Sequence, residues 1–183
     1  MSPGLLGLVV TIAILIIDAV ISIWNSYTAG KVSSVSKGLG VLFYVLGGLF
    51  PMTYVMSIAI TALLAYFKII TYTTVNLLLN FDFIVFGAVI IVWGVIATVT
   101  SIIATVRTRS WRAGLVSAYN ISALIYDTWE YLSNIGEAIS GFVKDLSDDK
   151  DSGLLVLVVV TAIALAIGFI ITYAAYRAGR ESV

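Results

Sequence analysis

The sequence predicts an all-α integral membrane protein, a bundle of four or five transmembrane helices that includes one long amphipathic helix. Hydrophobic residues make up 61% of the 183 residues and charged residues only 11%. A typical soluble domain has roughly 45–50% apolar residues and about 25% charged residues. Several apolar runs exceed the roughly 20 residues that a helix needs to span a bilayer. One further segment alternates polar and apolar residues at helical spacing, which is typical of an amphipathic helix.

Four apolar segments are expected to span the membrane, over about 3–28, 39–67, 83–106 and 153–176. The first is too long for a signal-peptide core and has no basic n-region, so it is expected to be a retained helix. The second contains Pro51, whose missing N–H predicts a kink near Gly47. The fourth has small residues at the spacing of close helix packing, namely Ala162 with Ala166 and Ala164 with Gly168. The whole chain, 1–183, is expected to form a single membrane domain.

The amphipathic helix is predicted over about 114–146. One face carries apolar or small residues: Ala118, Ile121, Ile125, Thr128, Leu132, Ile135, Ile139, Phe142 and Leu146. The other face carries polar residues: Asn120, Asp127, Glu130, Asn134, Glu137 and Asp145. A carboxylate near the centre of a span costs about 2.5–3.5 kcal/mol, whereas each Leu, Ile, Val or Phe returns only about 0.3–0.6 kcal/mol. A lone helix of this composition is close to balance, so the sequence leaves open whether it spans the membrane or lies on it.

Basic residues predict the orientation of the chain in the membrane. The segments that follow the first and third spans carry Lys31, Lys37, Arg107, Arg109 and Arg112. The positive-inside rule places both segments in the cytoplasm and the N-terminus outside. If the amphipathic helix spans, Arg177 and Arg180 also lie inside. If it does not, Lys144 and Lys150 take their place, so the balance of charge does not decide between the two topologies.

A short pattern, aromatic-x-Ala-Gly-x-x-Ser, occurs three times, at 27–33, 111–117 and 176–182. The simplest interpretation is an aromatic anchor at the membrane surface, followed by a glycine that ends a helix in the left-handed conformation. The alternative is a duplicated helix-hairpin unit. The glycines concerned are Gly30, Gly114 and Gly179.

The composition argues against enzymatic chemistry. The chain contains no cysteine and no histidine, so it cannot supply a disulfide, a thiolate nucleophile or the most common general base. It has no phosphate loop, dinucleotide fingerprint, zincin motif or serine elbow. We therefore expect a non-enzymatic protein with no catalytic residues, no cofactor and no metal site. Ten basic residues balance ten acidic residues, which gives no indication of a nucleic-acid partner.

Polar residues in the first span form the first candidate site. Asp18 is the only charged residue among the first thirty, and Ser22 and Asn25 follow it at helical spacing on one face. An ionisable group at membrane depth indicates a functional site by default. The alternative is a carboxyl group, protonated in the membrane, that only fixes helix packing.

The polar face of the amphipathic helix forms the second candidate site. Asp127, Glu130, Asn134 and Glu137 follow one another at i, i+3, i+7 and i+10. If this helix spans the membrane in a symmetric oligomer, these side chains would form rings of oxygen atoms, which attract cations and repel anions. The alternative is a solvated polar face of a helix outside the hydrocarbon, anchored by its aromatic residues.

Together these patterns predict a subunit that forms or lines a pathway for small cations or protons. Such a protein would be surrounded by membrane lipid and would act as a homo-oligomer or as a subunit of a larger membrane complex. The alternative function is a structural or accessory membrane subunit without transport activity, in an envelope, a virion membrane or a larger complex.

Overall fold

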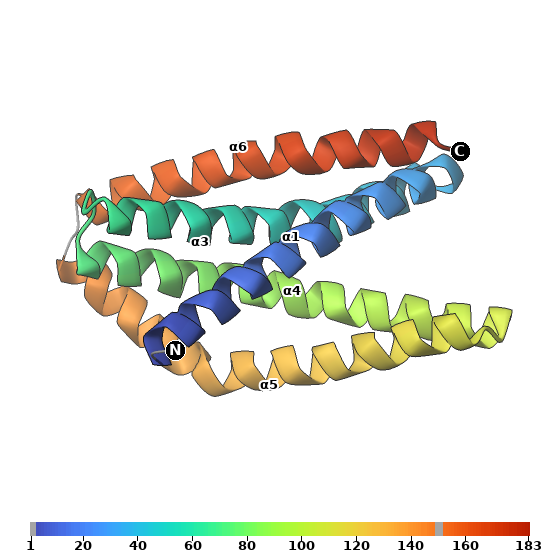
Figure 1. The fold of residues 1–183 in the computed structure, drawn as a ribbon, viewed down its shortest axis with the longest axis horizontal. Coiled ribbons are helices and arrows are strands. Elements are labelled where there is room, and N and C mark those ends of the chain that lie inside the picture. Colours follow the sequence, from blue (N-terminus) through green and yellow to red (C-terminus); the bar gives the residue numbers. More distant parts are fainter. Residues whose placement is uncertain (1–2, 149–151) are drawn as a thin grey trace. The chain divides into compact units, whose positions relative to one another are not determined.

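The computed structural model describes residues 3–148 and 152–183, with side chains from residue 9 onward. Every regular element in this described part is a helix, as the sequence predicts (Figure 1). In chain order the elements are α1 (Pro3–Val35), α2 (Lys37–Tyr44), the π-helix η1 (Val45–Leu49), α3 (Phe50–Tyr66), α4 (Tyr72–Thr108), α5 (Trp111–Asp148) and α6 (Ser152–Glu181). By length and composition four stretches can cross a membrane: α1, the continuous path from α2 to α3, α4 and α6.

The helices are longer than the apolar runs that predicted them. The third span was expected over about 83–106, but α4 begins at Tyr72, where the Thr71 hydroxyl accepts a hydrogen bond from the Thr74 N–H at 3.1 Å. Asp82 therefore lies inside α4 and does not precede it. α4 ends where Arg109 adopts a left-handed conformation, with a φ of 49°. An apolar run marks where a helix meets lipid, whereas caps and backbone conformation decide where the helix begins and ends.

The contacts divide the chain into two compact units, which are described separately. The first unit comprises Met1–Ile70 and Leu155–Val183, and the second comprises Thr71–Leu154. Thus α1, α2, η1, α3 and nearly all of α6 belong to the first unit, and α4 and α5 form the second.

In the first unit, α1 and the path from α2 to α3 form an antiparallel hairpin packed through small residues. A Cβ atom added at Gly40 would clash with Ser33, and one added at Gly48 would clash with Ser26. Ser26 and Ser33 are themselves buried on α1. Backbones can approach this closely only where one partner lacks a side chain and the other has a short one.

Where the sequence predicts a kink near Gly47, the structure has a change of helix type, the π-helix η1. Pro51 has no N–H to donate to the carbonyl of Gly47, four residues earlier. The side chain of Asn25 on α1 replaces that donor, because its Nδ2 atom lies 2.9 Å from the Gly47 oxygen. The N–H of Phe50 donates to the carbonyl of Val45, which is the five-residue spacing of a π-helix.

The glycines of the repeated pattern do not end helices in the left-handed conformation, so that interpretation is wrong. No glycine in the described part has a positive φ, α1 continues beyond Gly30 to Val35, and the second copy, 111–117, opens α5. Gly30 and Gly179 instead mark a crossing of α1 and α6. A Cβ atom at Gly30 would clash with the carbonyl oxygen of Tyr176, and one at Gly179 would clash with that of Tyr27.

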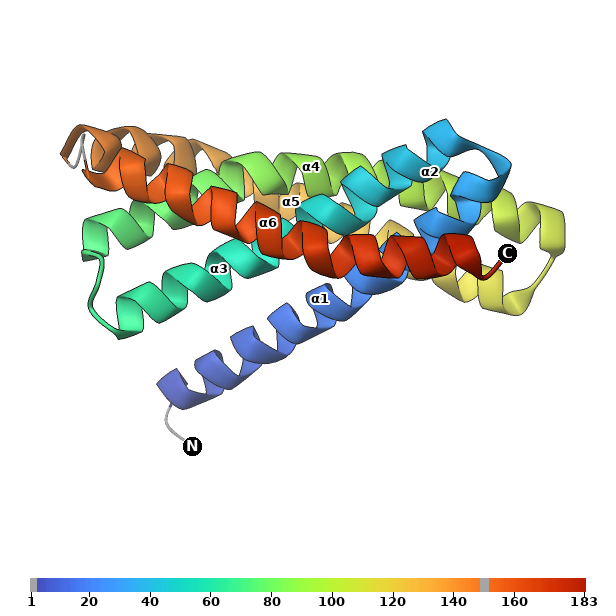
Figure 2. The ribbon, with the colours of Figure 1, turned by 90° about the horizontal axis from the view of Figure 1, so that it is seen from above.

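The helix α6 runs antiparallel to the path from α2 to α3 and therefore parallel to α1. Thr172 contacts the Tyr44 hydroxyl at 3.2 Å, and Gly168 packs against Thr53 further along the same path. The small pair Ala164 and Gly168 is buried, as its spacing predicts, whereas the pair 162 and 166 is exposed. As a result, the C-terminal ends of α1 and α6 lie at the same end of the first unit (Figures 1 and 2).

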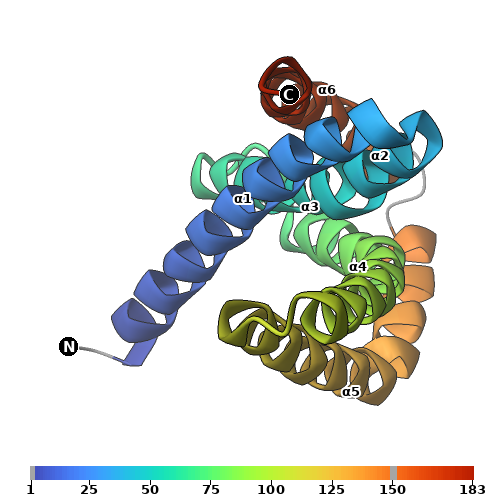
Figure 3. The same ribbon diagram turned by 90° about the vertical axis from the view of Figure 1, so that its right-hand side faces the viewer.

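In the second unit, α4 and α5 form a long antiparallel hairpin and lie side by side along most of their length (Figures 1 and 3). Near the turn, the hydroxyl groups of Thr105 and Ser117 are 2.8 Å apart. At the far end, the rings of Phe81 and Phe142 have their centroids 6.2 Å apart. The α5 helix thus accompanies α4 from one end to the other.

Candidate functional site

The seam between α4 and α5 is made by polar side chains of α5 that reach the backbone of α4. The Asn120 side chain donates a hydrogen bond to the carbonyl of Ala97 at 3.3 Å. About three turns further along α5, the Tyr131 hydroxyl donates to the carbonyl of Ile84 at 3.1 Å. The Tyr131 ring also stacks on Phe83, with 5.5 Å between centroids. These bonds fix the register of the two helices.

Glycines on α4 make room for these contacts. Gly87 faces the Tyr131 ring, which lies 2.7 Å from the position that a Cβ atom would take. About two helical turns further along α4, Gly94 faces Leu124. The Leu124 side chain lies 3.1 Å from the position that a Cβ atom at Gly94 would take. A side chain at position 87 would displace the Tyr131 ring, whereas one at position 94 would require only a small movement of the Leu124 side chain.

The second predicted site lies on α5 around and beside this seam. Asp127 is half-buried, and its spacing from Leu124 and Tyr131 places it on the seam side of the helix. The other three predicted residues are exposed: Glu130, Asn134 and Glu137. Asn134 donates a hydrogen bond to the Glu130 carbonyl within the same helix, at 2.8 Å. The structure therefore divides the predicted acidic face, with Asp127 towards the seam and the two glutamates outside it.

The apolar face of α5 is exposed. Ile125 and Leu132 are each 67% exposed and Trp129 is 74% exposed, whereas Ser117 and Ala138 are buried. The sequence pattern separates a polar and an apolar face but does not say which one meets α4. The side of α5 that meets α4 is mixed: Ser117, Asn120 and Tyr131 make hydrogen bonds to α4, and Leu124 and Phe142 make apolar contacts with it. The apolar face remains available for lipid or protein.

The first predicted site lies in the first unit, where two of its three residues serve the backbone. Ser22 is buried and donates to the carbonyl of Asp18 at 2.7 Å, and Asn25 donates to Gly47 as described above. Asp18 is half-buried, and its carboxyl group makes no hydrogen bond or ion pair to the other described side chains. Asp18 and Ser22 do share one face of α1, as predicted, but only Asp18 retains its side chain for another partner.

A third feature, a basic groove, was missed by sequence reasoning. In the first unit, the ends of α1, α2 and α6 enclose a groove lined by Ser33, Ser34, Lys37, Val41, Tyr176 and Arg180. In the sequence, Lys37 and Arg180 indicate only the orientation of the chain in the membrane. The repeated pattern was the available signal, because its copies at 27–33 and 176–182 meet in space and bring the basic ends of two helices together.

Comparison of the chain with protein-family models, with curated proteins and with solved structures gave no match. The function is therefore argued from the geometry of these sites.

Proposed function

We propose that the protein is an integral membrane protein with five spans and that its α4–α5 pair lines a pathway for small cations or protons. The observation that carries the proposal is the register of α5 on α4. Asp127 and Glu130 lie between Asn120, which bonds to Ala97, and Tyr131, which bonds to Ile84. The stretch of α4 between Ile84 and Ala97 contains no charged residue. If α4 spans the membrane, these two carboxyl groups lie at hydrocarbon depth.

The packing of the first unit supports a fifth span independently. The C-terminal ends of α1 and α6 lie together, so α3 ends and α6 begins at the opposite face of the membrane. The second unit must therefore start and finish at that same face. If α4 crosses the membrane once, α5 crosses it again in this topology. With 38 residues, α5 is about 57 Å long at 1.5 Å per residue, which exceeds the roughly 30 Å of hydrocarbon.

This topology places seven of the ten basic residues at one face. They are Lys31, Lys37, Arg107, Arg109, Arg112, Arg177 and Arg180. By the positive-inside rule that face is cytoplasmic and the N-terminus lies outside. This is the orientation that the positive-inside rule predicts from the sequence, and the parallel course of α1 and α6 favours the version in which the amphipathic helix spans.

Carboxyl groups at membrane depth suit cation transfer. In a low-dielectric environment they attract cations and protons and repel anions. Glu130 and Glu137 are exposed on a single chain, so they require polar surroundings, which copies of the chain or a partner subunit can supply. We therefore propose a homo-oligomer or a larger complex in which these residues face a wet path, while lipid covers the apolar helix faces. Asp18 on α1 is a second candidate relay for protons.

The test is cation and proton flux into vesicles that contain the purified protein. We expect the wild type to conduct, and we expect the double variant Asp127→Asn with Glu130→Gln to lose most of its flux while it still assembles. The matched control is Asp145→Asn with Asp148→Asn, which also removes two negative charges from α5 but beyond the stretch that pairs with 84–97; its flux should stay near the wild-type value. Asp18→Asn in the same assay tests the relay. A correctly assembled wild type that carries no flux would overturn the proposal.

A structural or accessory role is the second candidate, and the exposed apolar face of α5 favours it. Ile125 and Leu132 on that face could pack against other copies of the chain in a membrane scaffold. Cross-linking in the same vesicles distinguishes the two functions. Assembly into ordered oligomers without any flux supports the scaffold, whereas flux that depends on Asp127 and Glu130 supports the pathway.

A further inference from the structure

We propose that the basic groove in the first unit binds the phosphate group of an anionic lipid. Two cations, Lys37 from α2 and Arg180 from α6, line the groove together with the side chains of Ser33, Ser34, Val41 and Tyr176. The proposal does not depend on transport, because it concerns another unit and another chemistry. It requires only that α1, α2 and α6 lie in a membrane.

The close crossing of α1 and α6 holds the groove in place. Because Gly30 and Gly179 allow the two backbones to touch, the helix ends that carry the groove cannot shift freely. A hydrogen bond also links α1 to the residue that follows α6 at this end, because the Tyr27 hydroxyl donates to the Ser182 hydroxyl at 3.2 Å. A site held by backbone contacts on two helices is preorganised for a small, rigid group such as a phosphate.

The donors in the groove match a phosphate group. An arginine can bind two phosphate oxygens at once, and a lysine supplies a compact charge. The Tyr176 hydroxyl can donate a further hydrogen bond. The helix α2 begins at the edge of the groove, and its first backbone hydrogen bond runs from the Gly40 N–H to the Ser36 carbonyl. The N–H groups of residues 37–39 precede this bond and are available to a ligand, because the Ser36 side chain does not cap them.

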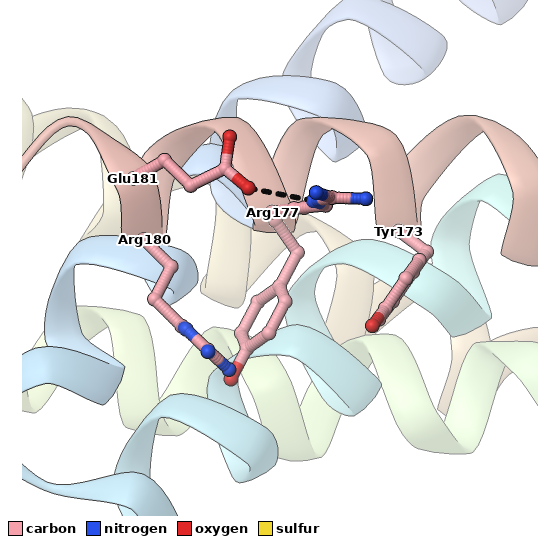
Figure 4. A pocket seen from close by; sticks show the side chains of 5 residues that line it. Tyr173, Arg177, Arg180 and Glu181 are labelled. Carbon is pink, nitrogen blue, oxygen red and sulfur yellow. Dashed lines mark hydrogen bonds and ion pairs between the residues drawn. The ribbon is translucent and has the colours of Figure 1, made fainter.

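Among the residues that the structure describes, no carboxylate lines the groove. Glu181 is the nearest acid in the sequence, but it is bound to Arg177, with 2.6 Å between the Arg177 Nε atom and the Glu181 Oε1 atom. Figure 4 shows this pair on α6, with the Arg180 side chain extending away from it. Among the described residues, neither Lys37 nor Arg180 forms an ion pair, so both side chains are available to an anionic ligand.

The location favours a lipid as the source of the phosphate. The groove lies at the end of the helices where the basic residues gather, the cytoplasmic face in the proposed topology, and anionic lipids are enriched in that leaflet. Val41 and the ring of Tyr176 provide an apolar wall on which the glycerol backbone and upper acyl chain can rest. A free phosphate ion shares the same donors but would not use this wall.

The test is lipid retention by the detergent-solubilised full chain, measured by native mass spectrometry. Phosphatidylglycerol is compared with phosphatidylcholine of the same acyl chains. We expect the wild type to retain phosphatidylglycerol in preference, and Lys37→Gln with Arg180→Gln to weaken that binding about twentyfold to thirtyfold, at about fivefold for each cation removed. The matched control is Arg107→Gln with Arg112→Gln, which removes the same charge from the second unit and should weaken binding less than threefold, roughly.

A second arm identifies the source of the phosphate. Radiolabelled inorganic phosphate is added to lipid-free micelles of the wild type and of the groove variant. Lipid binding that inorganic phosphate cannot replace supports a headgroup site, and phosphate binding that is lost in the groove variant supports a site for the free ion. The proposal would be overturned if the groove variant, with an unchanged unfolding midpoint, retained as much phosphatidylglycerol as the wild type. It would also be overturned if the control variant lost as much phosphatidylglycerol binding as the groove variant.

Discussion

At the α1–α6 crossing two backbones touch because Gly30 and Gly179 have no side chains, whereas along the α4–α5 seam Asn120 and Tyr131 reach across to carbonyl groups of the partner helix. The first contact forms only because both glycines lack a Cβ atom, and an added Cβ atom at either position would clash with the partner's backbone. The second depends on specific donors and places polar groups between the helices. Two helices can therefore be held together either by close contact of their backbones, as in the first unit, or by side-chain hydrogen bonds to the partner's backbone, as in the second.

The largest expected effect is at the crossing. In Gly30→Ala the new Cβ atom meets the backbone of Tyr176, which cannot move away as a flexible side chain can. We expect a loss of about 3 kcal/mol or more in the free energy of unfolding, measured by titration of the protein in mixed micelles with a denaturing detergent.

The control for this variant is Gly136→Ala on α5, where nothing lies within 4 Å of the new Cβ atom. Since alanine is the better helix former by about 1 kcal/mol, this substitution should be neutral or stabilising. An equal destabilisation by both substitutions would mean that the crossing is not as close as described.

The next effect concerns the bond from Asn25 to Gly47. In Asn25→Ala the Gly47 carbonyl loses its donor, and a buried unpaired group of this kind costs about 1–3 kcal/mol. In a Pro51→Ala background, residue 51 regains an N–H four residues after Gly47, so the cost of removing Asn25 should fall by half or more. A double-mutant cycle of unfolding free energies measures this coupling. Strict additivity would show that Asn25 does not compensate for the proline.

The smallest effect is expected at the seam. Tyr131→Phe keeps the ring stacked on Phe83 and removes only the hydroxyl that donates to Ile84, so we expect a loss of about 0.5–1.5 kcal/mol. Tyr126→Phe, on the same helix but exposed, is the control and should change the stability by less than about 0.5 kcal/mol. If the two variants behave alike, the seam is not held by this hydrogen bond.

Much of the fold could be predicted from the sequence because apolar runs report lipid-facing helices directly. The helix class, the four long apolar helices and the irregularity at Gly47 followed from composition and from Pro51. Helix ends could not be predicted as well, because α4 begins at the Thr71 cap and includes polar residues such as Asp82. The meaning of Gly30 and Gly179 was also missed, since one sequence cannot tell a glycine that ends a helix from one that admits another backbone.

The candidate sites were predictable only as sets of residues on one helix. Helical spacing predicted that Asp127 and Glu130 share one face of α5, but in the structure Asp127 is half-buried and Glu130 is exposed, and only the bond from Tyr131 to Ile84 shows which part of α4 they accompany. Asn25 was assigned to an ion pathway, and its partner, the Gly47 carbonyl, is a backbone atom of another helix. The basic groove forms where the ends of α1, α2 and α6 lie together. The spacing of residues along the chain does not predict contacts between distant helix ends.

The central claim is that α5 crosses the membrane beside α4, and cysteine labelling tests it most directly. The chain has no native cysteine, so single cysteines at Ser34, Ser147 and Val183 can each be labelled with an impermeant maleimide in sided vesicles. We predict that positions 34 and 183 react from one face and position 147 from the other. If 34 and 147 react from the same face and 183 from the opposite face, α5 does not cross, and its carboxyl groups lie outside the hydrocarbon.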